Sequence, residues 1–371
     1  MQPRPRRTGP AAALVALALT VAAAGCGTDS DASGSPGTEG SAISAKRCAE
    51  NRKAGKITYL SGYQYQSSVS ILEYVAASKL GYFKDLCLDV SLKPGTGDTA
   101  QNTKLLAGGQ ATVSPVSEQD VIQARANGID ITGVSSYSDA GLDVLMTNKD
   151  ITALTQLDGK TVGHKGYMPA TVRAMLVEAG VKWDSLHLVK QGYDPSVLPR
   201  RQGGLEALTG FVSNEPNQLK AAGHAVTVWK PVDHGVPGSL GAMAVNPAFA
   251  QAHPHAVQDI LRAALHAYAY CSADGHIDEC VGYAADLSGP MYDKKLNTAI
   301  WKTEIQVVKD YPTAGQPVGG VDAGNVSKIV DMLRRFGIVP SGVTADQAQK
   351  WFDPSFVKSV YTGDELIWPA P

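Results

Sequence analysis

Short apolar strands alternate with helical patterns through most of this chain, and this alternation restricts the fold more than any other feature. Residues 57–60 form an apolar run, after which Val69, Leu72 and Val75 recur at the spacing of a helix. The same order of strand and helix repeats up to residue 134. Strands that are separated by helical crossovers pair in parallel, with right-handed connections. The sequence therefore predicts a doubly wound α/β sheet.

A second series of strands and helices begins near Thr147. Its strands are expected at residues 160–163, 186–190, 208–212 and 226–229, with helices at residues 171–179 and 215–222. After about Val245 the pattern is helical only. A helical tail that has no sheet of its own must pack back on the first lobe, so the chain crosses between the lobes twice. We therefore expect residues 49–146 and 245–371 to form lobe 1, and residues 147–244 to form lobe 2.

The N-terminus has the pattern of an export signal. Arginines near the start precede an uncharged run at residues 11–24, which is shorter than the about 20 residues that a membrane span needs. Ala23 to Cys26 resembles the bacterial lipobox, although Ala23 stands where a leucine is usual. We expect residues 1–25 to be a lipoprotein signal peptide, Cys26 to carry the lipid, and residues 26–48 to be a flexible tether. The alternative is a plain secretion signal with an incidental cysteine.

Four further cysteines suit a chain that is sent to an oxidising compartment. Four cysteines allow three pairings, and buried free thiols remain an alternative. Cys271 and Cys280 flank a short polar loop, and Cys48 and Cys87 each precede a predicted strand. We expect the disulfides Cys48–Cys87 and Cys271–Cys280. A metal site is not expected, because the chain has no C-x-x-C motif.

Polar and aromatic side chains follow the carboxyl ends of the predicted strands, where open α/β sheets bind their ligands. The candidate ligand-binding residues are Tyr63, Gln64, Tyr65, Ser117, Glu118, Tyr137, His164, Tyr167, Tyr193, Asn214 and Glu215. Tyrosine faces can stack on a flat, weakly polar ring, and amide, hydroxyl and carboxyl groups can meet its hydrogen-bonding edge. Each tyrosine taken singly also fits an ordinary loop surface. Asn214 and Glu215 also fit the cap of a helix that has Pro216 in its first turn.

Three segments resemble one family in order and in spacing. Residues 73–84 read EYVAASKLGYFK, residues 104–111 read KLLAGGQA, and residues 157–163 read LDGKTVG. They resemble the type II solute-binding proteins of bacterial ABC importers, in the group that takes thiamine precursors, sulfonates and nitrate. Residues 210–216, GFVSNEP, are similar to the pyrimidine-precursor branch of that group. Glu206-Ala207 stands where that branch usually has Asp-Ala, and Gly203-Gly204 is extra, so the ligand itself stays open.

The resemblance implies a periplasmic-binding-protein-like fold and a lipoprotein on the outer face of the cell membrane. It also implies capture of a small, heteroaromatic, thiamine-pyrimidine-precursor-like ligand between the lobes, and delivery to an ABC permease and its ATPase. Binding of a sulfonate, nitrate or another small organic solute is an alternative, as is a ligand sensor that acts on a receptor. We expect a monomer with no cofactor.

An enzyme or a nucleic-acid-binding protein fits the sequence less well. Gly95 to Ala100 matches a loose G-x-G-x-x-A, but glycine turns before an Asp-capped helix give the same pattern. The chain has no nucleophile elbow, no H-E-x-x-H motif and no P-loop, and it lacks the cysteine-rich iron segment of pyrimidine-synthesising enzymes. With 33 basic and 35 acidic side chains, the net charge of -2 gives no electrostatic reason to bind nucleic acid.

Overall fold

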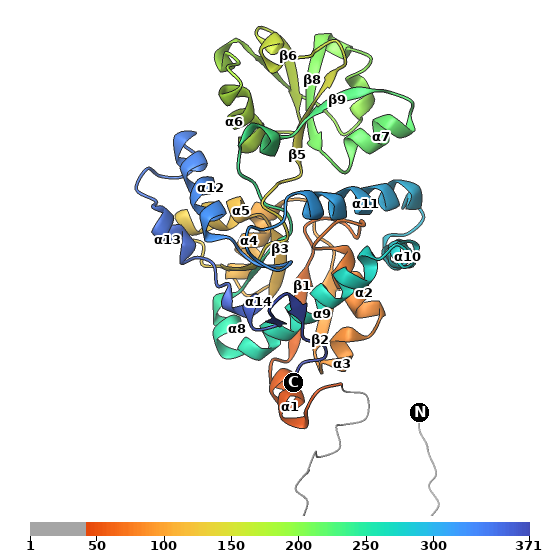
Figure 1. Cartoon of the computed structure of the whole chain (residues 1–371), viewed down its shortest axis with the longest axis vertical. Coiled ribbons are helices and arrows are strands. Elements are labelled where there is room, and N and C mark those ends of the chain that lie inside the picture. The colour runs from red at the N-terminus through yellow and green to blue at the C-terminus, as the bar shows by residue number, and fades with distance from the viewer. Residues whose placement is uncertain (1–41) are drawn as a thin grey trace, which may run out of the picture. The chain divides into compact units, whose positions relative to one another are not determined.

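The computed structural model describes residues 42–371, which contain two five-stranded sheets with helices around them (Figure 1). The strand order is β2-β1-β3-β10-β4 in the first sheet and β7-β6-β8-β5-β9 in the second. The strands of the first sheet are β1 (Lys56–Leu60), β2 (Asp89–Lys93), β3 (Val113–Val116), β4 (Thr132–Ser135) and β10 (Ala242–Val245). Those of the second are β5 (Asp143–Asn148), β6 (Thr161–His164), β7 (His187–Lys190), β8 (Leu205–Phe211) and β9 (Val226–Trp229). The expected two-lobe α/β fold is confirmed. The expected signal peptide and Cys26 lie outside the described residues.

Each sheet contains one antiparallel strand, where the alternation of strands and helices predicted parallel pairing throughout. β10 runs antiparallel to β3 and β4, and β5 runs antiparallel to β8 and β9. Both strands follow a crossing between the lobes, so each begins at the edge of its sheet where the parallel strands end. The lobe boundary expected at 146/147 falls inside β5, and the one expected at 244/245 falls inside β10.

Two segments connect the lobes and lie against each other. Residues 136–142 lead from β4 to β5, and residues 230–241 lead from β9 to β10. Tyr137 N–H donates to Leu240 O at 2.8 Å, and Leu240 N–H donates back to Ser138 O at 3.1 Å. Gly238 N–H donates to Asp139 O at 3.3 Å. The two crossings thus form one hydrogen-bonded hinge.

Helices from both halves of the chain cover the sheets. Lobe 2 contains α6 (Ala170–Glu178) and α7 (Glu215–Ala221), with short 3-10 turns at η1 (Leu154–Leu157), η2 (Trp183–Ser185), η3 (Pro195–Val197), η4 (Gln202–Gly204) and η5 (Pro231–His234). The N-terminal part of lobe 1 supplies α1 (Ala45–Lys53), α2 (Leu72–Lys79), α3 (Tyr82–Asp85), α4 (Thr99–Ala107) and α5 (Glu118–Ala126). The tail supplies α8 (Pro247–Ala252), α9 (Pro254–Ser272), α10 (Ile277–Ser288), α11 (Lys294–Asp310), α12 (Ala323–Arg335), α13 (Ala345–Gln349), α14 (Ser355–Lys358) and the hairpin of β11 (Tyr361–Thr362) and β12 (Glu365–Leu366).

Helix α9 ties the tail to lobe 1, because it packs on α1, α2, α3, α8 and α14. Its side chains join the residues of α2 and β1 in one buried cluster. Asp259 of α9 is fully buried and bonds Arg262 Nε at 3.1 Å, Arg47 Nε at 2.8 Å and Asn51 Nδ2 at 2.7 Å. The carboxylate therefore holds α1 against the central helix of the tail.

The expected disulfides Cys48–Cys87 and Cys271–Cys280 are both confirmed. Cys48 lies in α1, which Ser44 caps, so the last residues of the expected tether are helical. Cys280 lies in α10, and its disulfide joins α9 to α10 across the polar loop. No helix among residues 42–371 is long and apolar enough to cross a membrane.

Candidate functional site

The candidate residues follow strands whose carboxyl ends share an edge in each lobe. Tyr63 follows β1, whereas Lys165, Tyr193 and Glu215 follow β6, β7 and β8. β1 and β3 are parallel, as are β6, β7 and β8, so their loops emerge on one edge of each sheet. These side chains therefore lie at the sheet edge where open α/β proteins usually bind their ligands.

Glu215 is the buried centre of the lobe 2 group. It is the first residue of α7 and only 1% exposed. Its Oε2 accepts the Phe211 N–H at 2.7 Å, and its Oε1 accepts the Asn214 amide at 3.2 Å and pairs with the Lys165 ammonium. Glycine at position 210 leaves room for this carboxylate, because a Cβ there would lie 2.8 Å from Glu215 Oε2 and would force it to shift. Both oxygens of the carboxylate are therefore satisfied by the protein itself.

Lys165 is the member of this group that reaches the surface. Its side chain is 18% exposed, and its Nζ lies 5.6 Å from the ring centroid of Tyr193 and 5.9 Å from that of Phe211. Both distances allow cation–π attraction. Tyr193 is 81% exposed and Phe211 is 46% exposed. Burial lowers the pKa of Lys165 to about 8, so the side chain still carries its charge at neutral pH.

Sequence reasoning did not single out Lys165 or Phe211. Both lie in or beside segments that follow predicted strands. That position was the one sequence feature that could have marked them as candidate site residues. The ion pair joins residues 50 positions apart, and no local pattern predicts it. His164 and Tyr167 flank Lys165; Tyr167 is exposed, and His164 Nδ1 is buried without a hydrogen-bond partner among the described residues.

In lobe 1, the loop after β1 leaves one tyrosine exposed. Tyr63 is 48% exposed, whereas Tyr65 is buried and its carbonyl accepts from Ser288 Oγ at 2.8 Å. Gln64 Nε2 donates to Gly95 O at 3.4 Å. A Cβ on Gly95 would lie 1.9 Å from the carbonyl oxygen of Ser61, so close backbone packing explains the glycine. The G-x-G turn at residue 95 therefore supports the Tyr63 loop.

Three other candidates face the interior of lobe 1 and do not join these groups. Ser117 caps α5 in a capping box with Asp120. Glu118 is fully buried and accepts from Asn325 Nδ2 at 3.0 Å, and burial raises its pKa to about 8. Tyr137 is buried in the hinge, with its ring centroid 5.1 Å from that of Tyr268. Glu118 and Tyr137 are buried and Ser117 is half-buried, so none of the three belongs to the exposed groups.

One buried carboxylate connects the loop regions of the two lobes. Glu304 of α11 accepts from Ser68 Oγ at 2.7 Å and from Val69 N–H at 2.6 Å in lobe 1. It also accepts from Ser213 Oγ of lobe 2 at 2.7 Å. Beside it, Asn217 Nδ2 donates to Thr303 Oγ1 at 3.0 Å. Sequence reasoning missed this contact.

The bonds of Glu304 fix where the two loop regions lie. Ser68 follows the loop that carries Tyr63, and Ser213 precedes Asn214 and Glu215. The segment after β1 and the segment after β8 are thus bonded to the same side chain. Burial raises the pKa of Glu304 to about 7, against the hydrogen bonds, which lower it.

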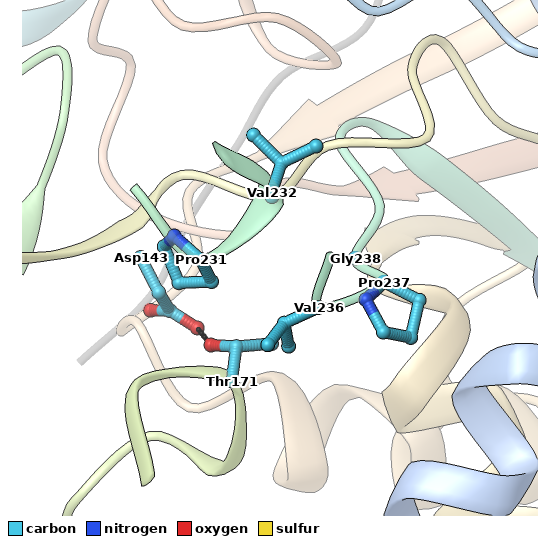
Figure 2. Close-up of a pocket in the computed structure, with 8 residues that line it drawn as sticks. Asp143, Thr171, Pro231, Val232, Val236, Pro237 and Gly238 are labelled. Atoms are coloured by element: carbon cyan, nitrogen blue, oxygen red, sulfur yellow. Dashed lines mark hydrogen bonds between the residues drawn. The ribbon is translucent and has the colours of Figure 1, made fainter. Parts of the chain in front are cut away.

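Two cavities lie apart from these residues. Figure 2 shows the smaller one, at the hinge, where Thr171 Oγ1 donates to Asp143 Oδ2 at 2.9 Å between Pro231 and Pro237. Its volume of about 10 Å³ suits about one water molecule. The larger one, of about 450 Å³, lies between α6 and α12 and is lined by side chains that include Glu178 and Arg335. Among residues 42–371 no cluster of His, Cys, Asp and Glu is arranged to hold a metal.

Comparison with known proteins identifies a family and a similar protein whose ligand is named. The family described as NMT1/THI5 like matches residues 68–275. The formylaminopyrimidine-binding protein of Halalkalibacterium halodurans is 25% identical over 299 residues, which cover 76% of this chain and 86% of that protein.

Solved structures agree on the fold. The periplasmic aliphatic sulphonate binding protein SsuA of Escherichia coli aligns with a TM-score of 0.60 and 14% identity, over 85% of this chain and 96% of that chain. The periplasmic nitrate-binding protein NrtA of Synechocystis PCC 6803 aligns with a TM-score of 0.57 and 11% identity, over 82% and 87%. At these identities the likeness establishes the architecture alone.

Proposed function

Because the chain belongs to the NMT1/THI5-like family, we propose that it is the extracytoplasmic solute-binding component of an ABC importer. It captures a small heteroaromatic solute of the thiamine-pyrimidine-precursor kind between its lobes. A lipid on Cys26 holds it at the membrane, where it delivers the solute to a permease and its ATPase. It acts as a monomer and carries out no reaction.

The observation that carries this proposal is the meeting of two loop regions at Glu304. The exposed ring of Tyr63 belongs to one region, and the group formed by Lys165, Tyr193, Phe211 and Glu215 belongs to the other. Exposed aromatic rings beside a few polar groups suit a flat heteroaromatic ligand. The formylaminopyrimidine-binding relative supports the same class of ligand.

A thermal-shift screen tests the proposal. The panel contains substituted pyrimidines, riboflavin, alkanesulfonates, nitrate and amino acids. A ligand that binds only the folded protein raises the melting temperature with the logarithm of its concentration. We expect pyrimidines to raise it. A shift with sulfonates or nitrate alone would refute the heteroaromatic ligand, and no shift with any small solute would refute solute binding.

Calorimetry with two matched variants then locates the ligand. Tyr63→Ala removes an exposed ring from the loop after β1, and Leu287→Ala removes a similarly exposed apolar side chain from α10. We expect the first to weaken pyrimidine binding about 5-fold, since stacking on an aromatic ring contributes about 1 kcal/mol. The second variant should bind as the wild type does. Equal affinities for both variants would place the ligand elsewhere.

A further inference from the structure

The contacts of Glu215 bear on what kind of group the ligand presents. A carboxylate at the start of α7 would suit a ligand amine if its oxygens were open. They are engaged by the Phe211 N–H, by the Asn214 amide and by the Lys165 ammonium, and the side chain is almost fully buried. A ligand amine that displaced Lys165 would break this ion pair and leave the charge of the lysine without a partner, which is strongly unfavourable.

Lys165 has donors to spare. An ammonium group has three N–H donors, and Glu215 is its one acceptor among residues 42–371. The head group lies beside the exposed rings of Tyr193 and Phe211, and its side chain keeps partial contact with solvent. A ligand that packs on these rings meets the lysine before it can meet the carboxylate.

We propose that Lys165 is the specificity-determining residue of the site and that the ligand presents an oxygen acceptor to its ammonium group. The acceptor is a carbonyl or an acidic oxygen carried by the ring that packs on Tyr193 and Phe211. Glu215 is a positioning residue: it holds the ammonium through the ion pair and does not contact the ligand. This inference rests on the proposed solute-binding function.

The charge of Lys165 also rejects a class of ligands. A protonated amine at the same place would face a like charge at short range, in a site partly shielded from water. The affinities of ring compounds that differ in one substituent should therefore depend on the charge and hydrogen-bonding capacity of that substituent. The order expected is carboxylate or formyl oxygen first and aminomethyl last.

Calorimetry on the purified protein tests this ranking with three pyrimidines that share one ring and carry a formyl, a carboxyl or an aminomethyl group. The variants are Lys165→Met, Lys165→Arg and Lys182→Met, the last being a matched loss of charge at an exposed lysine of lobe 2. Loss of a hydrogen bond to a charged donor should weaken binding of the acceptor-bearing ligands about 10- to 100-fold in Lys165→Met. Arginine should restore most of that loss, and Lys182→Met should change nothing.

Salt separates the two kinds of acceptor. If the physiological acceptor is an acidic oxygen, the carboxyl compound binds more tightly than the formyl compound, and its affinity falls as ionic strength rises. If the acceptor is a neutral carbonyl, the formyl compound binds more tightly and its affinity does not change with salt. Lys165→Met leaves Glu215 buried without its cation, so the double variant Lys165→Met/Glu215→Gln serves where the single variant does not fold. Its loss of affinity should match that of the single change.

Two outcomes would overturn the inference in different ways. Preference of the wild type for the aminomethyl compound, with an affinity that Lys165→Met leaves unchanged, would refute the role of Lys165 and preserve the solute-binding function. Failure of the wild type to bind any pyrimidine or other small solute would refute the proposed function, and the inference with it.

Discussion

Replacing Glu304 with glutamine should remove a pH dependence from the free energy of unfolding. The Glu304 carboxyl is fully buried and accepts hydrogen bonds from Ser68, Val69 and Ser213. Burial raises its pKa from 4.5 to about 7, and those hydrogen bonds offset the rise only in part. Glutamine has nearly the same shape, can accept with its oxygen and can donate to a serine hydroxyl, but it does not titrate.

The sign follows from proton binding in the two states. Between pH 4.5 and pH 7 the folded protein keeps the proton on Glu304, whereas the unfolded chain has lost it. The free energy of unfolding therefore falls as pH rises through this window. Below and above the window, Glu304 contributes no further change with pH. A pKa difference of about 2.5 corresponds to about 3 kcal/mol, at about 1.4 kcal/mol for each pKa unit. The full contribution should appear, because the group is shielded from solvent.

Urea unfolding of the wild type and of Glu304→Gln between pH 4 and pH 8 measures this effect. The stability of the variant minus that of the wild type should rise by about 3 kcal/mol from pH 4.5 to pH 7 and then level off. Glu73 and Glu118, whose pKa values burial raises to about 8, titrate in both proteins and largely cancel in the difference.

Ser213→Ala is the control for the hydrogen bond across the lobes. It removes one donor from the carboxyl and costs about 1 kcal/mol, but it leaves Glu304 buried and titratable. Its stability should still fall as pH rises, over a window that extends to higher pH, because the lost hydrogen bond had lowered the pKa of Glu304. A difference between Glu304→Gln and the wild type that stays constant from pH 4.5 to pH 7 would refute the reasoning, because a buried carboxyl with a raised pKa cannot give that result.

Three further changes have expected outcomes. Asp259→Ala leaves the buried Arg262 without its carboxylate partner and should destabilise the protein by about 3–5 kcal/mol in urea unfolding. Asp286→Ala breaks an exposed pair with Lys79 and should cost under about 1 kcal/mol. Equal costs would contradict the argument that burial makes an ion pair costly to break. Replacing Cys48 and Cys87 by serine should cost about 4 kcal/mol and replacing Cys271 and Cys280 about 3 kcal/mol, since the loops span 39 and 9 residues; the reverse order by chemical unfolding would contradict the chain-entropy argument. Gly210→Ala places a Cβ 2.8 Å from Glu215 Oε2 and 2.9 Å from Met146 Cε, so it should cost about 1–3 kcal/mol and weaken ligand binding; calorimetry showing wild-type affinity would mean that the carboxylate does not position the site.

The alternation of strands and helices was predictable because it rests on local patterns, although β5 and β10 were not among the expected strands. Asp98 caps α4 through the Gln101 N–H, as expected for an aspartate before a helical run, and β9 has the bounds that its apolar residues predict. The directions of β5 and β10 were not predictable, because both strands are short apolar runs like their neighbours. Their direction depends on the hinge, which delivers each of them to its sheet at the carboxyl edge.

The candidate site was predictable only as far as the backbone determines it. The rule that ligands bind beyond strand ends selected Tyr63, Tyr193 and Glu215, which do follow β1, β7 and β8. It also selected Ser117, Glu118 and Tyr137, whose side chains turn inward to cap a helix or fill the hinge. The rule cannot tell these cases apart, since side-chain direction is set by packing. It likewise cannot reveal that Lys165 covers the carboxylate of Glu215.

Glu304 did leave a signal in the sequence of α11. Ile300, Trp301, Ile305 and Val308 are buried together with it, so an acidic residue stands within the apolar face of an amphipathic helix. A buried carboxylate needs donors, and donors for this one had to come from other elements. Such a residue predicts a polar junction, although it does not say between which parts of the chain.

The junction at α11 gives the helical tail a part in positioning the two loop regions of the proposed site. The hinge connects the lobes through the backbone, and its Leu142 O also accepts from Val212 N–H of the segment before α7 at 2.8 Å. Helix α11 bonds both the end of the Tyr63 loop and the segment before α7, through Glu304 to Ser68 and Ser213. Tyr311, after its last turn, donates to Asp233 of the hinge at 2.6 Å. Without these contacts, only the hinge would orient the two loop regions. The relative position of the two loop regions therefore depends on a helix of the tail as well as on the hinge.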